Sequence, residues 1–384
     1  MGGWGTLGGM ASPALLDAFD RQVAWCGASA PFTAQVLARS RHWLQHDAAA
    51  GAAFDALSAD PAAAAVPLRW AAALHHLALQ GAEPWRSLWP PEGDFVDVSA
   101  GQLDDAIERA WAHHRPQVRA ALASPPQTNE VQRSAALLPG LLHMAAATGL
   151  PLVLLEIGAS AGLNLWCDRY RHVHAAWQWG DPASPLTLRC DWRGPAPTAA
   201  RANLRIVRRA GCDARPIDLG RPDEGLRLAS YVWPDQGERL ARLNAARAAV
   251  AGWMKQDQAQ VEALSAAEFV GREVSAGSPG SATVLMHSVV WQYIAADEQA
   301  AITQTMQAAG EAASADRPLA WLRLEPPTQG GGDFELRCRL WPGGTEHLLA
   351  RAHPHVAHLH WLADGRADGQ ADGQAAGAPD GPAA

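Results

Sequence analysis

One stretch constrains the fold of this chain more than any other: residues 151–168, which read PLVLLEIGASAGLNLWCD. Its uninterrupted apolar run, Leu152 to Ile157, is typical of a strand that is buried on both faces of a parallel sheet. Small residues from Gly158 to Gly162 follow, and then Leu163 opens a segment with the pattern of a helix. A strand, a glycine turn and a helix start together form a ligand site, because the first amides of a helix have no partner within it.

The turn supports several interpretations, and each implies a different function. A dinucleotide fingerprint counted from Gly158 fails, because its second and third glycines would fall on Ser160 and Leu163. A loop that binds an adenosyl group without phosphates tolerates a small side chain such as Ser160. As a nucleophile elbow, GASAG matches G-x-S-x-G and makes Ser160 the nucleophile. A tight turn without any ligand is the plainest alternative.

The residues before the turn favour the loop that binds an adenosyl group over the nucleophile elbow. In hydrolases with a nucleophile elbow, several strands and an oxyanion loop precede the serine. Here the upstream residues have helical spacing, so the strand that ends at Ile157 is the first one we expect in the sheet. Both interpretations nevertheless stay open at the level of sequence.

Composition excludes several classes of protein. A net charge of -8 argues against a general nucleic-acid binder, which would carry a basic surface. Lys255 is the only lysine, so no G-K-[ST] phosphate loop exists. The five cysteines are dispersed and lack a C-x-x-C pair, which indicates reduced thiols and a cytoplasmic protein. Residues 134–155 are uncharged and long enough to span a bilayer, but Pro139 and Pro151 interrupt them, so we expect no membrane segment.

The pattern along the chain divides it into four parts. We expect a disordered N-terminus over 1–11, a helical region over 12–125, a Rossmann-like domain of methyltransferase type over 126–362 and a disordered low-complexity tail over 363–384. Within the third part, further strands are expected at 204–208, 226–233, 283–287 and 319–324, and a hairpin at 334–341 and 347–351. The expected fold class is therefore α/β, with a mostly parallel Rossmann-like sheet that ends in an antiparallel hairpin.

Polar residues near the expected strand ends are the candidate site. Asn129, Glu130 and Arg133 open the helix before the first strand and lie close together at helical spacing. His287 follows an apolar strand, where residues line the crevice of an open sheet, so it is a candidate general base. Asp235 is expected to cap a long helix.

A dense group of histidines occurs near the C-terminal end, at His353, His355, His358 and His360. On a strand the first two would share one face and the last two the other. One metal would therefore need the chain to fold back, and we expect no metal site.

Several blocks resemble the bacterial domain of unknown function 2332 family. They are QTNEV from Gln127, LLEIGASAGLNL from Leu154, DRY from Asp168, WGDPASP from Trp179, GCDARPID from Gly211, YVWPDQ from Tyr231, HSVVWQY from His287 and AHPH from Ala352. The resemblance covers roughly residues 12–362 and implies a fold but no activity.

A looser similarity connects the glycine turn and the strand order to class I methyltransferases, which bind S-adenosylmethionine. It implies that Glu156, Gly158, Ser160, Gly162 and Asn164 would hold the cofactor. It also implies that an acid after the second strand would bind the ribose hydroxyls. Asp213 fits in type, and Asp191 is the rival.

We therefore expect an S-adenosylmethionine-dependent methyltransferase, or a relative with its fold, that acts on a small-molecule acceptor. Catalysis would use His287, Glu130 and Asp235, and the acceptor would contact Asn129, Arg133 and Trp233. A serine esterase is the first alternative, with Ser160 as nucleophile beside Asp218 and either His287 or His353. A protein that binds a small ligand without catalysis is the second.

Overall fold

The computed structural model describes residues 10–89, 98–123, 126–275, 277, 279–327 and 332–367, which form two compact units. The first unit combines Met1–Asn129 with Ile217–Lys255, and the second combines Glu130–Pro216 with Gln256–Ala384. This division differs from the expected one, which assigned all of 126–362 to the sheet domain. A segment from the middle of the chain is thus part of the helical unit.

The helical unit is built around stacked aromatic rings. Trp43 and Trp70 stack with ring centroids 5.6 Å apart, and Phe54 meets the edge of Trp70 at 5.3 Å. Such large buried rings contribute much of the apolar area that stabilises a helical core. The helices of this unit are α1 (Pro13–Cys26), α2 (Pro31–His46), α3 (Ala48–Asp55), α4 (Val66–Leu79), α5 (Trp85–Leu88), α6 (Ala100–His113), α7 (Arg115–Leu122), α9 (Pro222–Ser230) and most of α10 (Gly237–Asp257).

The expected strand at 226–233 is wrong, because α9 (Pro222–Ser230) occupies most of that stretch. Helix signals are present in the sequence: Pro222 stands in the first turn, Asp223 and Glu224 follow it, and Arg227 lies in the last turn. Leu228 and Ala229 are buried with Gly225, at spacings of three and four residues. An apolar run too short to show its period caused the error.

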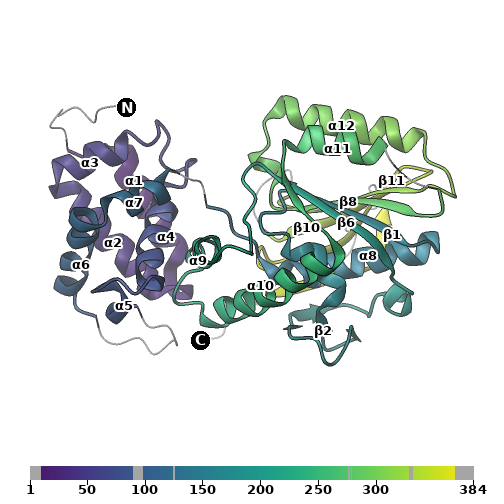
Figure 1. The fold of residues 1–384 in the computed structure, drawn as a ribbon, viewed down its shortest axis with the longest axis horizontal. Helices are drawn as coiled ribbons and strands as arrows, with labels where there is room; N and C mark the ends of the chain where they lie inside the picture. The colour runs from purple at the N-terminus through teal and green to yellow at the C-terminus, as the bar shows by residue number, and fades with distance from the viewer. Residues whose placement is uncertain are drawn as a thin grey trace, which may run out of the picture. The chain divides into compact units, whose positions relative to one another are not determined.

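The second unit contains a nine-stranded sheet that confirms the expected fold class (Figure 1). Its order is β5-β12-β11-β10-β9-β8-β1-β6-β7. The pairs among β7, β6, β1, β8 and β9 are parallel, and those among β9, β10, β11 and β12 are antiparallel. These strands are β1 (Leu152–Ile157), β5 (Asp191–Arg193), β6 (Ile206–Asp213), β7 (Val261–Ala263), β8 (Ala282–Ser288), β9 (Leu319–Glu325), β10 (Phe334–Trp341), β11 (Thr345–Ala352) and β12 (His358–Ala367).

Helices cover both faces of the parallel part of the sheet (Figure 1). Helices α11 (Ala266–Ser275) and α12 (Ala296–Glu311) pack on one face through Phe269 and Ile302, which share a core with Leu285. Helix α8 (Ser134–Thr148) packs on the other face, where a Cβ at Gly140 would lie 2.7 Å from Leu322 Cδ1. Glycine at that position therefore lets α8 approach the sheet closely.

The segment after the glycine turn is a 3-10 helix, η3 (Leu163–Arg169), instead of the expected α-helix. Its geometry is broken at Trp166, where φ is -110°. The chain then forms a small separate sheet of β2 (Arg171–Val173), β3 (Gln178–Trp179) and β4 (Thr187–Leu188) before it returns to β6. The crossover from β1 to β6 is therefore made mainly of short irregular elements.

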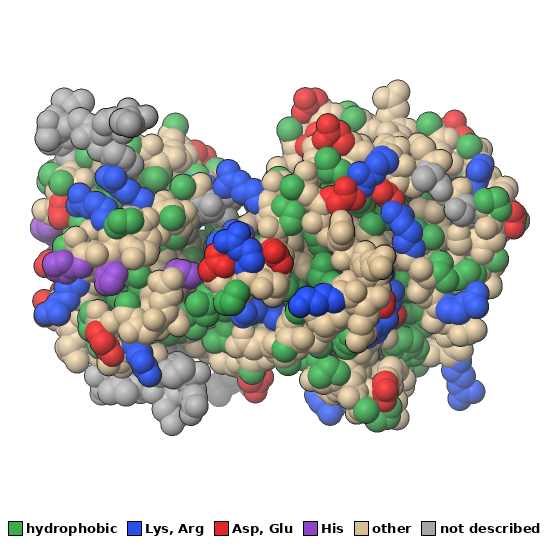
Figure 2. All heavy atoms as spheres, in the orientation of Figure 1, with side chains coloured by type: hydrophobic (Ala, Val, Ile, Leu, Met, Phe, Trp, Pro, Cys, Tyr) green, Lys and Arg blue, Asp and Glu red, His purple; other side chains and the backbone are tan. Residues whose placement is uncertain are grey.

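The predicted disordered ends fall largely outside the described residues, which begin at Met10 and end at Ala367. Strand β12 nevertheless extends to Ala367, five residues into the stretch expected as a tail. Within the described ranges, no helix has the length and apolar character that a membrane crossing needs. On the face of the molecule seen in Figure 2, acidic and basic side chains are interspersed.

Candidate functional site

The strand order of the sheet reverses at β1, and this reversal marks the candidate site. Strand β1 pairs with β6 on one side and β8 on the other, both in parallel. The chain leaves β1 toward β6, whereas from β8 it continues in the opposite direction to β9. The loops after β1 and β8 therefore diverge from neighbouring carboxyl ends. In open α/β sheets, this switch point is where ligands bind.

The turn after β1 depends on left-handed backbone conformations. Gly158, Ser160 and Gly162 have φ of 64°, 53° and 73°. A Cβ at Gly158 would lie 2.3 Å from Cγ2 of Val290, so the loop after β8 closes directly on this glycine. Ser160 adopts its φ without the freedom of glycine, at a typical cost of about 1–3 kcal/mol. Such strain must be held by the surroundings.

Asp213, the last residue of β6, holds the turn in place. Its Oδ2 accepts a hydrogen bond from the Ser160 amide at 3.0 Å, and its Oδ1 accepts one from the Arg215 amide at 2.8 Å. The rival acid, Asp191, begins β5 at the opposite end of the strand order. Of the two acids named from the sequence, Asp213 is therefore the one beside the turn.

Glu156 lies just before the turn and is buried, with only 2% of its surface exposed. Burial raises the pKa of its carboxyl well above the usual value, and nearby Asp213 raises it further, while Arg133 and a hydrogen bond from Asn164 act in the opposite direction. Asn164 in turn accepts a hydrogen bond from Ser134 Oγ at 2.8 Å. The structure thus brings Asn164 and the start of α8 together around the buried Glu156 carboxyl, whose pKa is raised.

Arg133 contacts two of the sequence blocks named above, HSVVWQY and AHPH. Its Nε donates to the Pro354 carbonyl at 3.3 Å, and its Nη1 donates to the Ser288 carbonyl at 3.4 Å. Glu130 caps the 3-10 turn Val131–Arg133 by accepting from the Gln132 amide at 3.1 Å. A 3-10 turn therefore replaces the helical start expected here. Arg133 holds this turn against the last residue of β8 and against the loop between β11 and β12.

His287 forms a pair with Glu325 that the sequence did not reveal. Nδ1 of the histidine lies 2.6 Å from Glu325 Oε1, and the same oxygen accepts the amides of Val290 at 3.1 Å and Trp291 at 3.4 Å. The imidazole is fully buried and stacks on Trp291 at 5.3 Å. The acid follows 38 positions later at the end of β9, so only the parallel pairing of β8 with β9 could have indicated it.

His287 and Glu156 project from opposite faces of the sheet. Glu156 pairs directly with Met286, so these two side chains share a face, and His287 is the next residue. Its neighbour across the strand pair is Arg323, on the face that carries α11 and α12. The general-base candidate and the buried acid thus belong to different sides of the switch point.

Three of the expected site residues belong to the helical unit. The Asp235 carboxylate accepts the amides of Phe32 at 2.7 Å and Thr33 at 3.0 Å, so the helix it caps is α2, and not α10 as expected from the sequence. Trp233 packs against the aromatic core of that unit, and Asn129 is its last residue before the chain enters the second unit.

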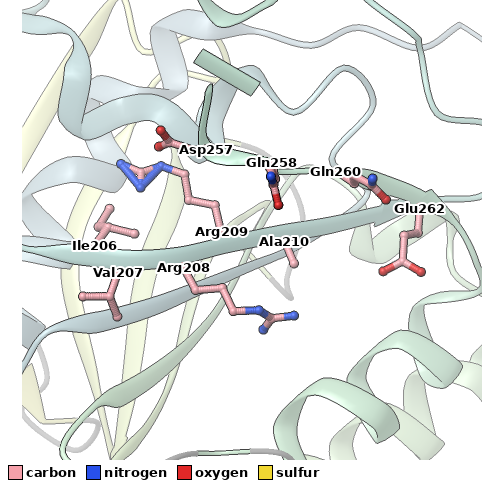
Figure 3. Close-up of a pocket in the computed structure, with 9 residues that line it drawn as sticks. All are labelled: Ile206, Val207, Arg208, Arg209, Ala210, Asp257, Gln258, Gln260 and Glu262. Atoms are coloured by element: carbon pink, nitrogen blue, oxygen red, sulfur yellow. The ribbon is translucent and has the colours of Figure 1, made fainter. Parts of the chain in front are cut away.

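A polar hollow with a volume of about 510 Å³ opens beside β6 (Figure 3). Arg209 points toward Asp257 on one side of the strand, and Arg208 points to the other side. The strand residues that line it, 206–210, form the first half of β6. Because ligands of open α/β sheets bind at the carboxyl ends of the strands, we do not take this hollow as the main site.

The geometry around the alternative nucleophile is incomplete. Ser160 Oγ is buried and has no hydrogen-bond partner among the described residues, so no histidine activates it in this conformation. His353 lies 5.6 Å from His358 between ring centroids, and His358 Nε2 is 2.9 Å from Asp333. Within the part of the chain that the structure describes, no three acidic, histidine or cysteine side chains are grouped to hold a metal.

The fold and the turn define a Rossmann-like α/β protein with a candidate ligand crevice at its switch point. The chain belongs to a family described as an uncharacterized protein conserved in bacteria (DUF2332), whose model matches residues 16–361. Comparison with curated proteins and with solved structures finds no match. Fold and site geometry must therefore carry any statement about function.

Proposed function

We propose that the protein is an S-adenosylmethionine-dependent methyltransferase that acts on a small-molecule acceptor. One observation carries the proposal: at the switch point, a left-handed turn and an acid from the adjoining strand stand side by side. The Asp213 carboxylate lies 3.0 Å from the Ser160 amide. An adenosyl group needs this combination, because its ribose hydroxyls donate to a carboxylate while the rest of the cofactor lies over exposed amides.

The cofactor would contact the residues that line the turn. Gly158 and Gly162 would form the turn under the cofactor through their left-handed backbone conformations. Asn164 and Glu156, whose carboxyl pKa is raised by burial, would supply hydrogen bonds on the α8 side of the sheet. Transfer of a methyl group from a sulfonium needs mainly alignment, plus a base where the acceptor carries an O–H or N–H.

The acceptor side of the site remains a set of predictions. His287 is the proposed base, supported by the Glu325 carboxylate that orients its ring. Glu130 is the second proposed catalytic group and Arg133 the proposed acceptor contact. Asn129, Trp233 and Asp235 keep their proposed roles, and all three belong to the helical unit. A cytoplasmic location is also proposed, and the five free cysteines support it.

Calorimetric titration of the full chain with S-adenosylhomocysteine tests the cofactor. We expect saturable heat, and Asp213→Asn should weaken binding about tenfold, because a charge-assisted hydrogen bond to the ribose is lost. Asp191→Asn is the matched control, since it makes the same change at the other end of the sheet. Absence of heat with folded wild-type protein, or equal effects of the two variants, would overturn the proposal.

A serine esterase is the second candidate, and the backbone of Ser160 favours it. A left-handed serine between a strand and a helical segment is the geometry of a nucleophile elbow. The acid and histidine would be Asp218 and either His287 or His353. This function predicts labelling by a fluorophosphonate probe that Ser160→Ala abolishes. Native mass spectrometry distinguishes these two enzyme functions from the third alternative, a protein that binds a small ligand without catalysis. For that alternative we expect a co-purified ligand and no turnover.

A further inference from the structure

Two exposed histidines lie one helical turn apart near the C-terminal end of α2, in the helical unit. They are His42 and His46, and both are exposed to solvent. Residues four positions apart are neighbours on one face of an α-helix. The two imidazole rings accordingly lie together, with their centroids 4.3 Å apart and their planes tilted by 46°. Helix α2 therefore presents a pair of adjacent imidazoles to solvent.

The buried side of α2 fixes the direction in which this pair points. Trp43 and Leu44, which lie between the two histidines in the chain, belong to the core of the helical unit. The Trp43 ring stacks on Trp70 with centroids 5.6 Å apart, so α2 cannot turn about its axis without breaking this core. A helix held in this way presents both imidazoles in advance, and a ligand that contacts both loses little affinity to ordering the backbone.

A hydrogen bond within the helix orients the ring of His46. Its Nδ1 lies 2.7 Å from the carbonyl oxygen of His42. Because a carbonyl oxygen can only accept, Nδ1 carries the proton, and Nε2 of the neutral ring keeps its lone pair. Histidines that bind metals have this arrangement, since their second ring nitrogen donates to a carbonyl or a carboxylate. His46 is therefore prepared to bind a metal through Nε2.

Two carboxylates next to the pair in the fold bind elsewhere. Asp47 follows His46 directly, and its Oδ1 caps α3 by accepting the Ala50 amide at 2.9 Å. Asp20 of α1 forms an ion pair at 2.7 Å with Arg41, the residue before His42. Within the ranges that the structure describes, no third histidine, cysteine or carboxylate joins the two rings in a complete metal centre. A metal ion bound by this pair would therefore keep coordination positions for water.

We propose that His42 and His46 form a binding site for a divalent metal ion that prefers imidazole nitrogen, such as Zn²⁺. Zinc binds histidine nitrogens at about 2.0–2.1 Å, so two rings can share one ion only where they are neighbours. The H-x-x-x-H spacing on a helix makes them neighbours. Mg²⁺ prefers oxygen ligands and is not expected to bind here. The site belongs to the helical unit and does not depend on methyl transfer.

Calorimetric titration of the full chain, without a polyhistidine tag, with zinc chloride tests the site. We expect saturable binding of zinc and no binding of magnesium chloride. His42→Asn and His46→Asn should each weaken zinc binding roughly a hundredfold, because the second imidazole of a chelating pair binds at a high effective concentration. The double variant should bind no more weakly than either single variant, since one histidine alone has already lost the chelate.

His360→Asn is the matched control, because it makes the same change at an exposed histidine of the sheet unit. Hydrogen exchange measured by peptide locates the ion, since zinc should slow exchange at the end of α2 in wild type and in His360→Asn. The proposal is overturned when folded wild-type protein does not bind zinc, when magnesium binds as tightly, or when zinc leaves exchange in α2 unchanged. It is also overturned when His42→Asn and His46→Asn bind as wild type does, or when His360→Asn weakens binding equally.

Discussion

At Gly158, the backbone conformation and the neighbouring loop both require glycine. We expect Gly158→Ala to lower the free energy of unfolding by roughly 3 kcal/mol, through its left-handed φ and the contact of a new Cβ with Val290. Gly149→Ala is the control, because Gly149 has a similar φ of 67° but no atom within 4 Å of a new Cβ. It should cost only about 1 kcal/mol. Equal losses in urea titrations would show that Val290 is not in contact.

The buried acid Glu156 gives a second prediction for a single residue. Its folded pKa is raised, whereas the unfolded chain ionises near pH 4.5, so the stability present below that pH is lost as the pH rises toward the folded pKa. Glu156→Gln removes this linkage and should be more stable than wild type at pH 8, with a smaller difference at pH 4.5. Glu311→Gln is the control, because it replaces a carboxylate by an amide at an exposed position. A constant difference across this range in urea titrations would contradict the raised pKa.

At the scale of elements, the start of α2 depends on a residue that lies 203 positions after Phe32 in the chain. Asp235 accepts the Phe32 and Thr33 amides, which a local cap would normally satisfy. Asp235→Ala should lower the free energy of unfolding by about 1–2 kcal/mol, and Asp235→Asn by less, because an amide keeps one acceptor. Hydrogen exchange measured by peptide should show the loss of protection in α2. Loss confined to α10 would contradict the assignment.

Prediction from sequence succeeded where local signals agree with the tertiary structure. The run Leu152–Ile157 is a buried strand, and 334–351 forms a hairpin, because period and turn residues determine both locally. The strand expected at 226–233 is α9, since tertiary contacts decided an apolar stretch that fits either structure. The partners of His287 and of Asp235 could not be predicted, because each depends on strand or helix pairing between distant segments.

On the scale of the whole molecule, each unit has its own core and its own buried polar groups. The chain leaves the helical unit after Asn129, returns at Ile217 and leaves again after Lys255. The chain therefore crosses between the same two units three times. Contacts such as Asp235 to α2 and His75 to the Ser230 carbonyl at 3.3 Å place Ile217–Lys255. A change in one of these contacts should affect the helical unit first.

The stability of the protein in acid tests whether each unit responds to its own buried groups. Burial lowers the pKa of His75 in the helical unit to about 4, and those of His172 and His174 in the sheet unit to about 3 and about 4. Above pH 6.5 these residues are neutral in both states. Between pH 6.5 and 4 the unfolded chain binds protons that the folded chain does not. As the pH falls through this range, each of these histidines therefore lowers the free energy of unfolding by about 1.4 kcal/mol per pH unit.

The variant His75→Phe should remove the contribution of His75 to this slope while keeping a ring against Trp89. Urea unfolding at pH 7, 6 and 5 measures the slope, and hydrogen exchange by peptide assigns the change to a unit. We expect the variant to reduce acid sensitivity in α4 and α9 and to leave β2 and β4 as sensitive as in wild type. An unchanged slope would mean that His75 is protonated in the folded protein, because only a histidine kept neutral there makes folding depend on pH in this range.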